Sequence, residues 1–503
     1  MRGHDSVEIL SGDIHLVDLQ TRLPFRYGMA TMTEAPHAFV RLRVRDGDRE
    51  ATGIAADHLP PKWFTKDPDA SIASEIDEML RTLETAVGLS EGRCAKTPFD
   101  LWCELSHDQA AWGRLQGAGG WPPLLVNFGM TLVERAMLEA VARARGLNWQ
   151  GLLHGGGLGI RLGDCDERLA DADVAGLLPT NPPPNVIARQ TVGLADPLGA
   201  NAVSEHDRLN DGLPETLQEC LEAYGLFHLK IKVQGDWAAD RERLLEIDSL
   251  VTGASGASRS RFRFTLDANE QFRDLGAFRD YWGQMASDRR LAAFLSGLLF
   301  VEQPIHRSVA LDADVMGCDG GLASWSERPP IIIDESDAEP DSLARALALG
   351  YDGTSHKNCK GVFRGVVNAC LLSRLNRDAA TDQRPRQYIM SGEDLVNICP
   401  VALPQDLAVA ASLGVESIER NGHHYFAGLS VFPDEMAEQA LAAHPDLLGR
   451  SRDGWPAVLI SEGRMSLESV RKAPLGVGFE LDVDQFESSA EWRRRRGIVG
   501  AAE

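Results

Sequence analysis

The second half of the chain alternates short apolar, β-rich runs with segments of helical periodicity, and this alternation constrains the fold more than any other feature. Amphipathic stretches such as 240–250 and 341–350 lie between most of the runs. Strands that alternate with helices eight times over roughly 240 residues predict a β/α barrel. A doubly wound open sheet is the alternative, and it is weaker because no Gly-x-Gly-x-x-Gly follows an early strand. The eight runs lie at 189–194, 227–233, 262–267, 297–302, 331–334, 353–357, 387–391 and 415–419.

The first 150 residues predict a separate α+β domain. Apolar alternation between residues 7 and 56 indicates strands, and helical spacing then begins near residue 71 and stops at Gly146. Two segments, 24–32 and 55–66, mix aromatic, basic, Gly and Pro residues, which is typical of binding loops and equally of plain surface loops. The Gly-, Asp- and Pro-rich segment 151–187 is interpreted as a linker or wrapping segment, which leaves 188–430 for the barrel.

Polar residues follow the apolar runs at the same place on successive predicted strands. The carboxyl ends of barrel strands converge on one mouth, so residues far apart in sequence should meet there. Three carboxylates on successive strands supply the hard oxygen ligands that Mg²⁺ prefers. Lysines beside a cation and partly removed from water lose part of their preference for the charged form, which suits acid–base catalysis. The set consists of Lys230, Lys232, Asp267, Glu302, Asp334 and Lys357.

Each of these residues also has an ordinary structural explanation. A single lysine at a strand end is usually a solvated charge, and a single Asp or Glu there usually caps a helix or forms a turn. Three carboxylates and two lysine positions in strand order, each after an apolar run, are much harder to explain as caps. The pattern as a whole therefore favours a functional site.

Four motifs in this order resemble the enolase superfamily, in its mandelate racemase/muconate lactonizing enzyme branch. They are 227–233 (FHLKIKV), 266–269 (LDAN), 300–305 (FVEQPI) and 333–336 (IDES). The resemblance covers most of the chain. It implies a modified, TIM-like (β/α)8 barrel over 188–430, and an α+β capping domain over 1–150 with lid loops near 24–32 and 55–66. It also implies that residues 431–503 complete the capping domain.

The resemblance assigns roles to matching positions. Asp267, Glu302 and Asp334 would bind Mg²⁺, with Mn²⁺ as an alternative ion. Lys232, the second lysine of Lys-x-Lys, would be one acid/base, and Lys230 would modulate its pKa.

A lysine on the sixth strand would serve the opposite face of the substrate. Lys357 is preferred over Lys360 because it directly ends the strand. The mandelate racemase type places a His on the seventh strand, whereas this strand ends in 390–394 (MSGED) without one. The resemblance is therefore to the two-lysine, muconate lactonizing type. Gly- and Ser-rich pieces near 253–260 and 317–326 depart from the pattern and are interpreted as insertions.

The expected function is that of a magnesium-dependent, metal-binding isomerase that removes the proton α to a substrate carboxylate. The resulting ene-diolate would be stabilised by the metal. Reprotonation from the other face gives racemisation or epimerisation, and cycloisomerisation uses the same intermediate. An acid-sugar dehydratase is the alternative, with His356 or His423 as the acid, and a catalytically silent barrel that binds a small acid is the second. Candidate substrate-binding residues are Asn269, Lys360, Glu393, Asp394, Arg26, Tyr27, His58 and His423.

Charge and cysteine usage limit the partners and the compartment. Lys and Arg total 51 against 74 Asp and Glu, and a net charge of −23 argues against nucleic acid or an anionic membrane. The basic run Arg493 to Arg496 is interpreted as a solvated helix face. Eight scattered cysteines without Cys-x-x-Cys spacing, and no signal or membrane-spanning segment, predict a cytoplasmic protein. We expect a homo-oligomer that acts on a small carboxylate.

Overall fold

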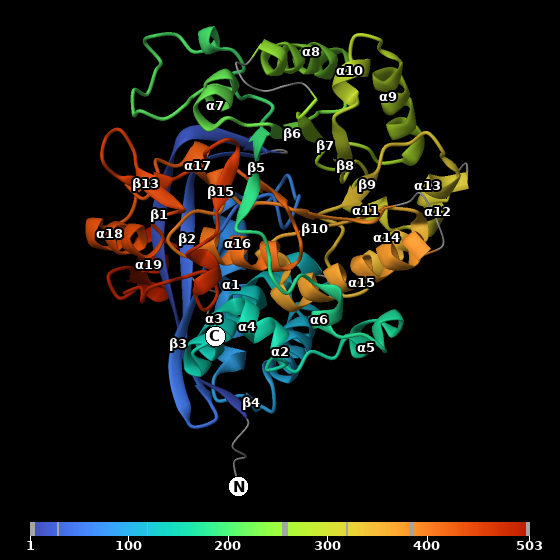
Figure 1. The fold of residues 1–503 in the computed structure, drawn as a ribbon. Helices are drawn as coiled ribbons and strands as arrows, with labels where there is room; N and C mark the ends of the chain where they lie inside the picture. Colours follow the sequence, from blue (N-terminus) through green and yellow to red (C-terminus); the bar gives the residue numbers. More distant parts are fainter. Residues whose placement is uncertain are drawn as a thin grey trace.

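The computed structural model describes residues 6–27, 30–117, 119–253, 260–317, 320–381 and 387–498. Figure 1 shows an antiparallel sheet with helices, coloured blue to cyan, against a barrel of strands and helices coloured green to orange. Most of the expected insertion near 253–260, and residues 318 and 319 of the other, lie outside the described residues. Within the described residues, no helix has both the length and the apolar character needed to cross a bilayer.

The N-terminal sheet is built from three long antiparallel strands, two of them joined by a tight turn. Burial alternates only near residues 40–44 of β2, whereas residues 35–40 of β2 and 53–58 of β3 are buried without interruption, so both faces of these stretches are covered. Helix α3 crosses β3 at Gly53, where an added Cβ would lie 2.0 Å from the carbonyl oxygen of Ala136, so only glycine allows this approach. The strands are β1 (Val7–Tyr27), β2 (Ala30–Asp46) and β3 (Arg49–His58), with the short strands β4 (Cys94–Ala95) and β16 (Glu487–Ser488) on β1.

The helices of the first part begin and end at the residues that local chemistry favours. Ser71 and Thr97 cap the first two long helices by accepting a backbone N–H, and Gly146 ends the third in the left-handed conformation. That third helix is buried along most of its length because it lies between the sheet and the barrel. The helices are α1 (Ile72–Ser90), α2 (Pro98–Gly113), α3 (Pro123–Arg145), α4 (Trp149–His154), α5 (Leu162–Cys165) and α6 (Val174–Leu177).

The predicted barrel is confirmed. Eight parallel strands pair in sequence order, and the last pairs with the first, so the sheet closes. The weak sixth run forms a strand in register with both neighbours. The strands are β5 (Asn185–Val192), β6 (His228–Lys232), β7 (Arg263–Asp267), β8 (Leu298–Glu302), β9 (Ile331–Ile333), β10 (Gly353–His356), β11 (Ile389–Gly392) and β12 (Ser417–Arg420).

The barrel helices pack outside the strands (Figure 1). The long ones follow the predicted helical periodicity, and short ones fill the connections around β8 and β9. They are α7 (Leu217–Tyr224), α8 (Trp237–Gly253), α9 (Leu275–Ser287), α10 (Ala292–Leu295), α11 (Arg307–Ala310), α12 (Ala313–Met316), α13 (Gly321–Ser324), α14 (Ser342–Leu349), α15 (Val362–Thr381) and α16 (Ala402–Ser412).

The C-terminal segment runs from the barrel back to the N-terminal sheet. Strand β15 pairs antiparallel with β5, and β16 then pairs with β1. In the last helix Arg493 is only 9% exposed and forms ion pairs with Asp77 and Glu84, so the interpretation of this basic run as a solvated face is wrong there. The elements are α17 (Gly422–Tyr425), α18 (Asp434–Ala443), β13 (Leu448–Arg450), β14 (Pro456–Val458), β15 (Arg464–Ser466) and α19 (Ser489–Arg496).

Helix α3 is bonded directly to the barrel next to the sixth strand. The buried carboxylate of Glu134 accepts the backbone N–H groups of Val362 and Phe363, at 2.9 and 2.7 Å, and so caps the start of α15. Asn127 donates to the carbonyl oxygen of Lys360 at 3.0 Å. These bonds fix the N-terminal part to the barrel close to the residues that end β10.

Candidate active site at the barrel mouth

Lys230 lies at the centre of the barrel mouth, surrounded by carboxylates. Its Nζ is 2.9 Å from Asp267, 2.8 Å from Glu302, 2.7 Å from Glu393 and 3.0 Å from Glu419. Burial alone would lower the pKa of Lys230, but the four carboxylates raise it well above its usual value. Lys230 therefore remains an ammonium ion and provides a fixed positive charge beside its neighbours.

Lys232 occupies one side of the mouth. Its Nζ is 2.5 Å from Oδ2 of Asp267, the residue that ends the neighbouring strand β7. Oδ1 of Asp267 accepts the backbone N–H of Asn269 at 2.8 Å, which orients the carboxylate. Burial tends to raise the pKa of Asp267, but Lys230 and Lys232 together lower it, so the carboxylate stays ionised.

Lys357 and Lys360 both reach Asp334 on the other side. Nζ of Lys357 is 2.8 Å from Oδ2 and Nζ of Lys360 is 2.9 Å from Oδ1 of Asp334. Lys360 also donates to the carbonyl and hydroxyl oxygens of Ser355, whereas Lys357 lines the cavity at the mouth, 4.5 Å from the centre of the Trp63 ring. Of the two lysines, Lys357 is thus the one placed to meet a ligand.

The strand order puts Lys232 and Lys357 across the mouth from each other. Lys232 ends β6 and Lys357 follows β10, and β7, β8 and β9 lie between these strands in the closed ring of eight. Four steps around a ring of eight is half a turn. A molecule held between the two lysines would therefore present opposite faces to them.

The carboxylates at the ends of β7, β8 and β9 have the donor chemistry that a divalent cation requires. Both oxygens of Glu302 are buried; Oε2 lies 2.8 Å from Nζ of Lys230, and Oε1 has no hydrogen-bond partner within the described structure. Burial and neighbouring acids raise the pKa of Glu302 well above its usual value, and Lys230 offsets this only in part. Among the described residues no three His, Cys, Asp or Glu side chains already form a metal-binding group, because lysine ammonium groups lie on Asp267 and Asp334. The donor set fits Mg²⁺ once these contacts rearrange.

A segment from the N-terminal part covers the mouth. Arg307 donates to the carbonyl oxygens of Trp63 at 3.0 Å and Phe64 at 3.1 Å, and also binds Glu270. Lys66 of the same segment forms an ion pair with Glu270. Together these bonds hold residues 63–66, here called the cover segment, against the barrel.

The cavity beneath the cover segment has an apolar part and a charged part. The polar and charged part consists of Lys230, Lys232, Asp267, Asn269, Asp334, Lys357, Asp394, Glu419 and Asn421. The apolar part is formed by Phe25, Pro60, Trp63, Leu395 and Val396.

Glu393 and Asp394, predicted from the end of the seventh strand, point to different places. Glu393 is buried below the mouth, between Lys230 and Arg189. Asp394 lines the cavity and accepts the backbone N–H groups of Asn397 at 2.7 Å and Asn421 at 2.8 Å. Burial raises the pKa of Asp394 to about 7. Asp394 thus joins the loops that follow β11 and β12 rather than capping the next helix.

Other predicted residues do not line this cavity. Arg26 is exposed near the end of β1, and the side chain of Tyr27 lies outside the described residues. His58 is buried and faces His37, with 3.2 Å between their Nδ1 atoms. His423 lines a different cavity, described below.

Some site residues were missed by sequence reasoning. Glu419 follows Ile418 near the end of the eighth strand, so the strand-end pattern that found the other carboxylates could have found it. Arg189 begins an apolar run and gives no such signal. Phe25 reaches the mouth from β1; it lies in the segment 24–32, where a lid loop is expected, but the residues singled out there are Arg26 and Tyr27.

Comparison with solved structures defines the class of fold: the chain has the fold of the enolase superfamily, and each match extends over nearly the whole chain. No protein-family model and no curated protein sequence matches the chain. A dipeptide epimerase from Enterococcus faecalis V583, complexed with Mg and the dipeptide L-Leu-L-Tyr, is 16% identical with a TM-score of 0.56, and the match covers 94% of this chain and 100% of that one. A muconate lactonizing enzyme from Pseudomonas fluorescens, complexed with muconolactone, is 16% identical (TM-score 0.54; 95% and 98%). An enolase from Bradyrhizobium, complexed with magnesium and mandelic acid, is 15% identical (TM-score 0.53; 98% and 99%).

Proposed function

We propose that the protein is a magnesium-dependent racemase or epimerase that moves the proton α to a substrate carboxylate. The observation that carries this proposal is the position of Lys232 and Lys357, half a turn apart around the barrel mouth. One lysine takes the proton from one face of the α-carbon, and the other returns a proton from the opposite face, so the configuration inverts. The names of two structural neighbours, a dipeptide epimerase and a muconate lactonizing enzyme, agree with an isomerase.

Asp267, Glu302 and Asp334 would hold the metal ion. Bound Mg²⁺ supplies positive charge beside the substrate carboxylate, where negative charge develops as the α-proton leaves. Lys230 adds a permanent positive charge next to Lys232, since four carboxylates keep it protonated. The cover segment and Phe25 exclude water from the mouth, which strengthens each of these interactions.

The shape and chemistry of the mouth favour an acid with one apolar substituent. The wall formed by Phe25, Trp63 and Val396 suits an aliphatic or aromatic group. A polyhydroxy acid would leave its hydroxyl groups without partners against this wall. The two histidines proposed as the acid of a dehydratase are also displaced: His356 is buried with Nε2 3.1 Å from Asn358, and His423 lines another cavity.

The test is deuterium uptake at the α-carbon in D₂O, measured by mass spectrometry with Mg²⁺ present. The panel contains single enantiomers of N-acetylphenylalanine, L-Leu-L-Phe and mandelate, together with aldonic acids. In the two-lysine mechanism wild-type protein labels both enantiomers of a substrate, whereas Lys232→Ala and Lys357→Ala each retain exchange with only one, and with opposite ones. Lys472→Ala, whose side chain is 78% exposed, serves as the control.

Three outcomes would contradict the proposal in different ways. If both variants lose exchange with both enantiomers, the claim that the two lysines act as independent bases is refuted. Loss of water from an aldonic acid would establish the dehydratase. A protein that Mg²⁺ stabilises but that exchanges no member of the panel would favour a barrel that only binds small acids.

A further inference from the structure

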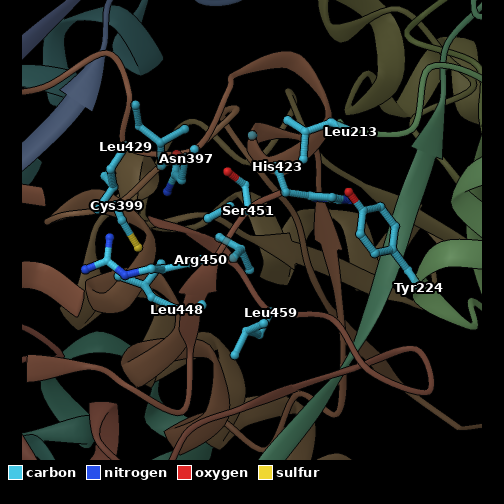
Figure 2. Close-up of a pocket in the computed structure, with 16 residues that line it drawn as sticks. Leu213, Tyr224, Asn397, Cys399, His423, Leu429, Leu448, Arg450, Ser451 and Leu459 are labelled. Carbon is cyan, nitrogen blue, oxygen red and sulfur yellow. The ribbon is translucent and has the colours of Figure 1, made fainter. Parts of the chain in front are cut away.

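Figure 2 shows a second cavity, and the loops that line part of it also form one wall of the barrel mouth. One side of it is formed by residues 397–399 and 422–423, which follow β11 and β12. The other side is formed by the C-terminal hairpin of β13 and β14, with Leu213 and Tyr224 at the edge. None of these residues takes part in the function proposed above.

The cavity and the barrel mouth share the same two loops. Residues 394–396 and 421 face the mouth, and residues 397–399 and 422–423 face the second cavity. Asp394 joins the loops through the N–H groups of Asn397 and Asn421. A displacement of either loop on the cavity side would therefore change the hydrogen bonds of Asp394.

The cavity is largely apolar, with unused hydrogen-bonding groups. Asn397 is 4% exposed, and its Oδ1 has no hydrogen-bond partner within the described structure. Oγ of Ser451, on the hairpin side, is also buried without a partner. Buried polar atoms of this kind normally have partners, so a molecule that supplies a donor would satisfy them. The apolar lining consists of Leu213, Ile398, Leu429, Leu448, Val458 and Leu459.

The charge of the lining excludes an ionic ligand. Arg450 is the only charged residue among the described lining residues, and its guanidinium already binds Glu438 at 2.6 Å and the carbonyl oxygen of Gly454 at 2.9 Å. His423 is neutral because burial lowers its pKa to about 3, and its Nε2 lies 3.3 Å from Oε1 of Gln190. An ion transferred into such a site would lose its hydration, and the single cation that lines it is already paired with Glu438.

We propose that this cavity binds an uncharged, mostly apolar small molecule bearing a hydrogen-bond donor, such as a primary amide or an alcohol, and that binding orders the loops around Asp394. The donor meets Oδ1 of Asn397 and the apolar body fills the space between Ile398 and the hairpin. The proposal stands apart from the reaction at the barrel mouth, because it requires only the cavity and the shared loops.

The test uses cyclohexanecarboxamide and cyclohexanecarboxylate, which share one apolar body and differ in charge and in the donor. Ligand-observed NMR titration of the full chain should show saturable binding of the amide, at least tenfold tighter than that of the carboxylate. Ala457→Phe fills the cavity from the hairpin and should abolish amide binding. Ala442→Phe, exposed on α18, is the matched control and should leave it unchanged.

Hydrogen exchange with and without the amide tests the link to the mouth. Binding should slow exchange in peptides covering 394–399 and 421–425 in wild-type protein and in Ala442→Phe, but not in Ala457→Phe. Three results would overturn the proposed site. They are equal binding of the two probes, no binding up to the solubility limit, and amide binding that Ala457→Phe leaves unaffected although the variant keeps its melting temperature. Protection confined to the hairpin would overturn the coupling. If Ala457→Phe lowers the melting temperature, Ser451→Ala serves instead. It removes one polar group only and should weaken binding of the amide at least threefold.

Discussion

Replacing Lys66 by alanine should make the cover segment open more often without unfolding the protein. The ammonium group of Lys66 forms an ion pair with Glu270 and donates to the carbonyl oxygen of Asn269 at 3.0 Å. Its side chain is 17% exposed, and that of Glu270 is fully buried. The substitution removes both bonds at one point of attachment, whereas Arg307 continues to hold the carbonyl oxygens of Trp63 and Phe64.

The free-energy cost of the substitution depends on the hydrogen bonds that Glu270 keeps. Removing one partner of a buried ion pair costs about 3–5 kcal/mol when the remaining charge is left alone. Here Arg307 still donates to Glu270 through its backbone N–H and its guanidinium, at 2.8 to 2.9 Å, so the carboxylate stays paired. The loss is then that of the Lys66–Glu270 ion pair and of the hydrogen bond to Asn269, reduced by the partial exposure of Lys66, or about 2 kcal/mol. This corresponds to about a 30-fold larger open population of the cover segment.

Hydrogen exchange measured by mass spectrometry provides the assay. Amides between residues 62 and 70 that are protected by closure should exchange about 30-fold faster in Lys66→Ala, while peptides from α1 serve as the internal reference. In a Glu270→Gln background the Lys66→Ala substitution should add little, because the ion pair is already lost. A change below threefold, or full additivity of the two substitutions, would refute the reasoning.

Four further expectations concern stability and metal binding. Burial raises the pKa of Glu134 to about 7, above its unfolded value of about 4.5, so the folded state holds the proton more tightly and stability should fall as the pH rises between these values. Glu134→Gln removes the ionisable group but keeps an acceptor oxygen for only one of the two N–H groups of α15, and it should remove this slope from the free energy of unfolding measured by urea titration across that pH range. Gly53→Ala should lower that free energy by about 3 kcal/mol, because the new Cβ meets backbone atoms of α3 that cannot turn away, and an unchanged melting temperature would contradict the close approach. Asp394→Ala leaves the N–H groups of Asn397 and Asn421 without an acceptor and should cost about 2 kcal/mol, with faster exchange in both loops as the check. In calorimetry Mg²⁺ should raise the melting temperature of wild-type protein but not that of Glu302→Gln, whereas equal shifts would show that Glu302 is not a ligand.

The fold and the centre of the site could be predicted from the sequence because both depend on local pattern. An apolar run followed by a charged residue marks a buried strand and its end, so Asp267, Glu302 and Asp334 were placed without knowledge of their neighbours. The parallel topology then brings these ends together whatever the loops do.

The surroundings of the site depend on contacts that leave no local pattern. His58 lies in segment 55–66, whose mixed composition is typical of a loop. It nevertheless ends β3 and faces His37 in the interior. Lys357 and Lys360 are close together in the sequence, and only their contacts distinguish them. Lys360 donates to Ser355, whereas Lys357 lies beside the Trp63 ring. Arg493 is drawn out of solvent by Asp77 and Glu84, which lie more than 400 residues earlier in the sequence.

The pairing of β16 with β1 affects the order in which the molecule can form during synthesis. The long strand β1 leaves the ribosome before the other described elements, but the strand that covers it at residues 15 and 16 is made about 470 residues later. The barrel strand β5 likewise pairs with β15, which is made much later in synthesis. Until the C-terminal segment is made, residues 15 and 16 of β1 and residues 185–187 of β5 lack these partners, and unpaired strand edges invite pairing with other chains. A chain shortened before residue 464 would keep both edges open, so aggregation, rather than loss of the mouth residues, is the defect expected of such a truncation.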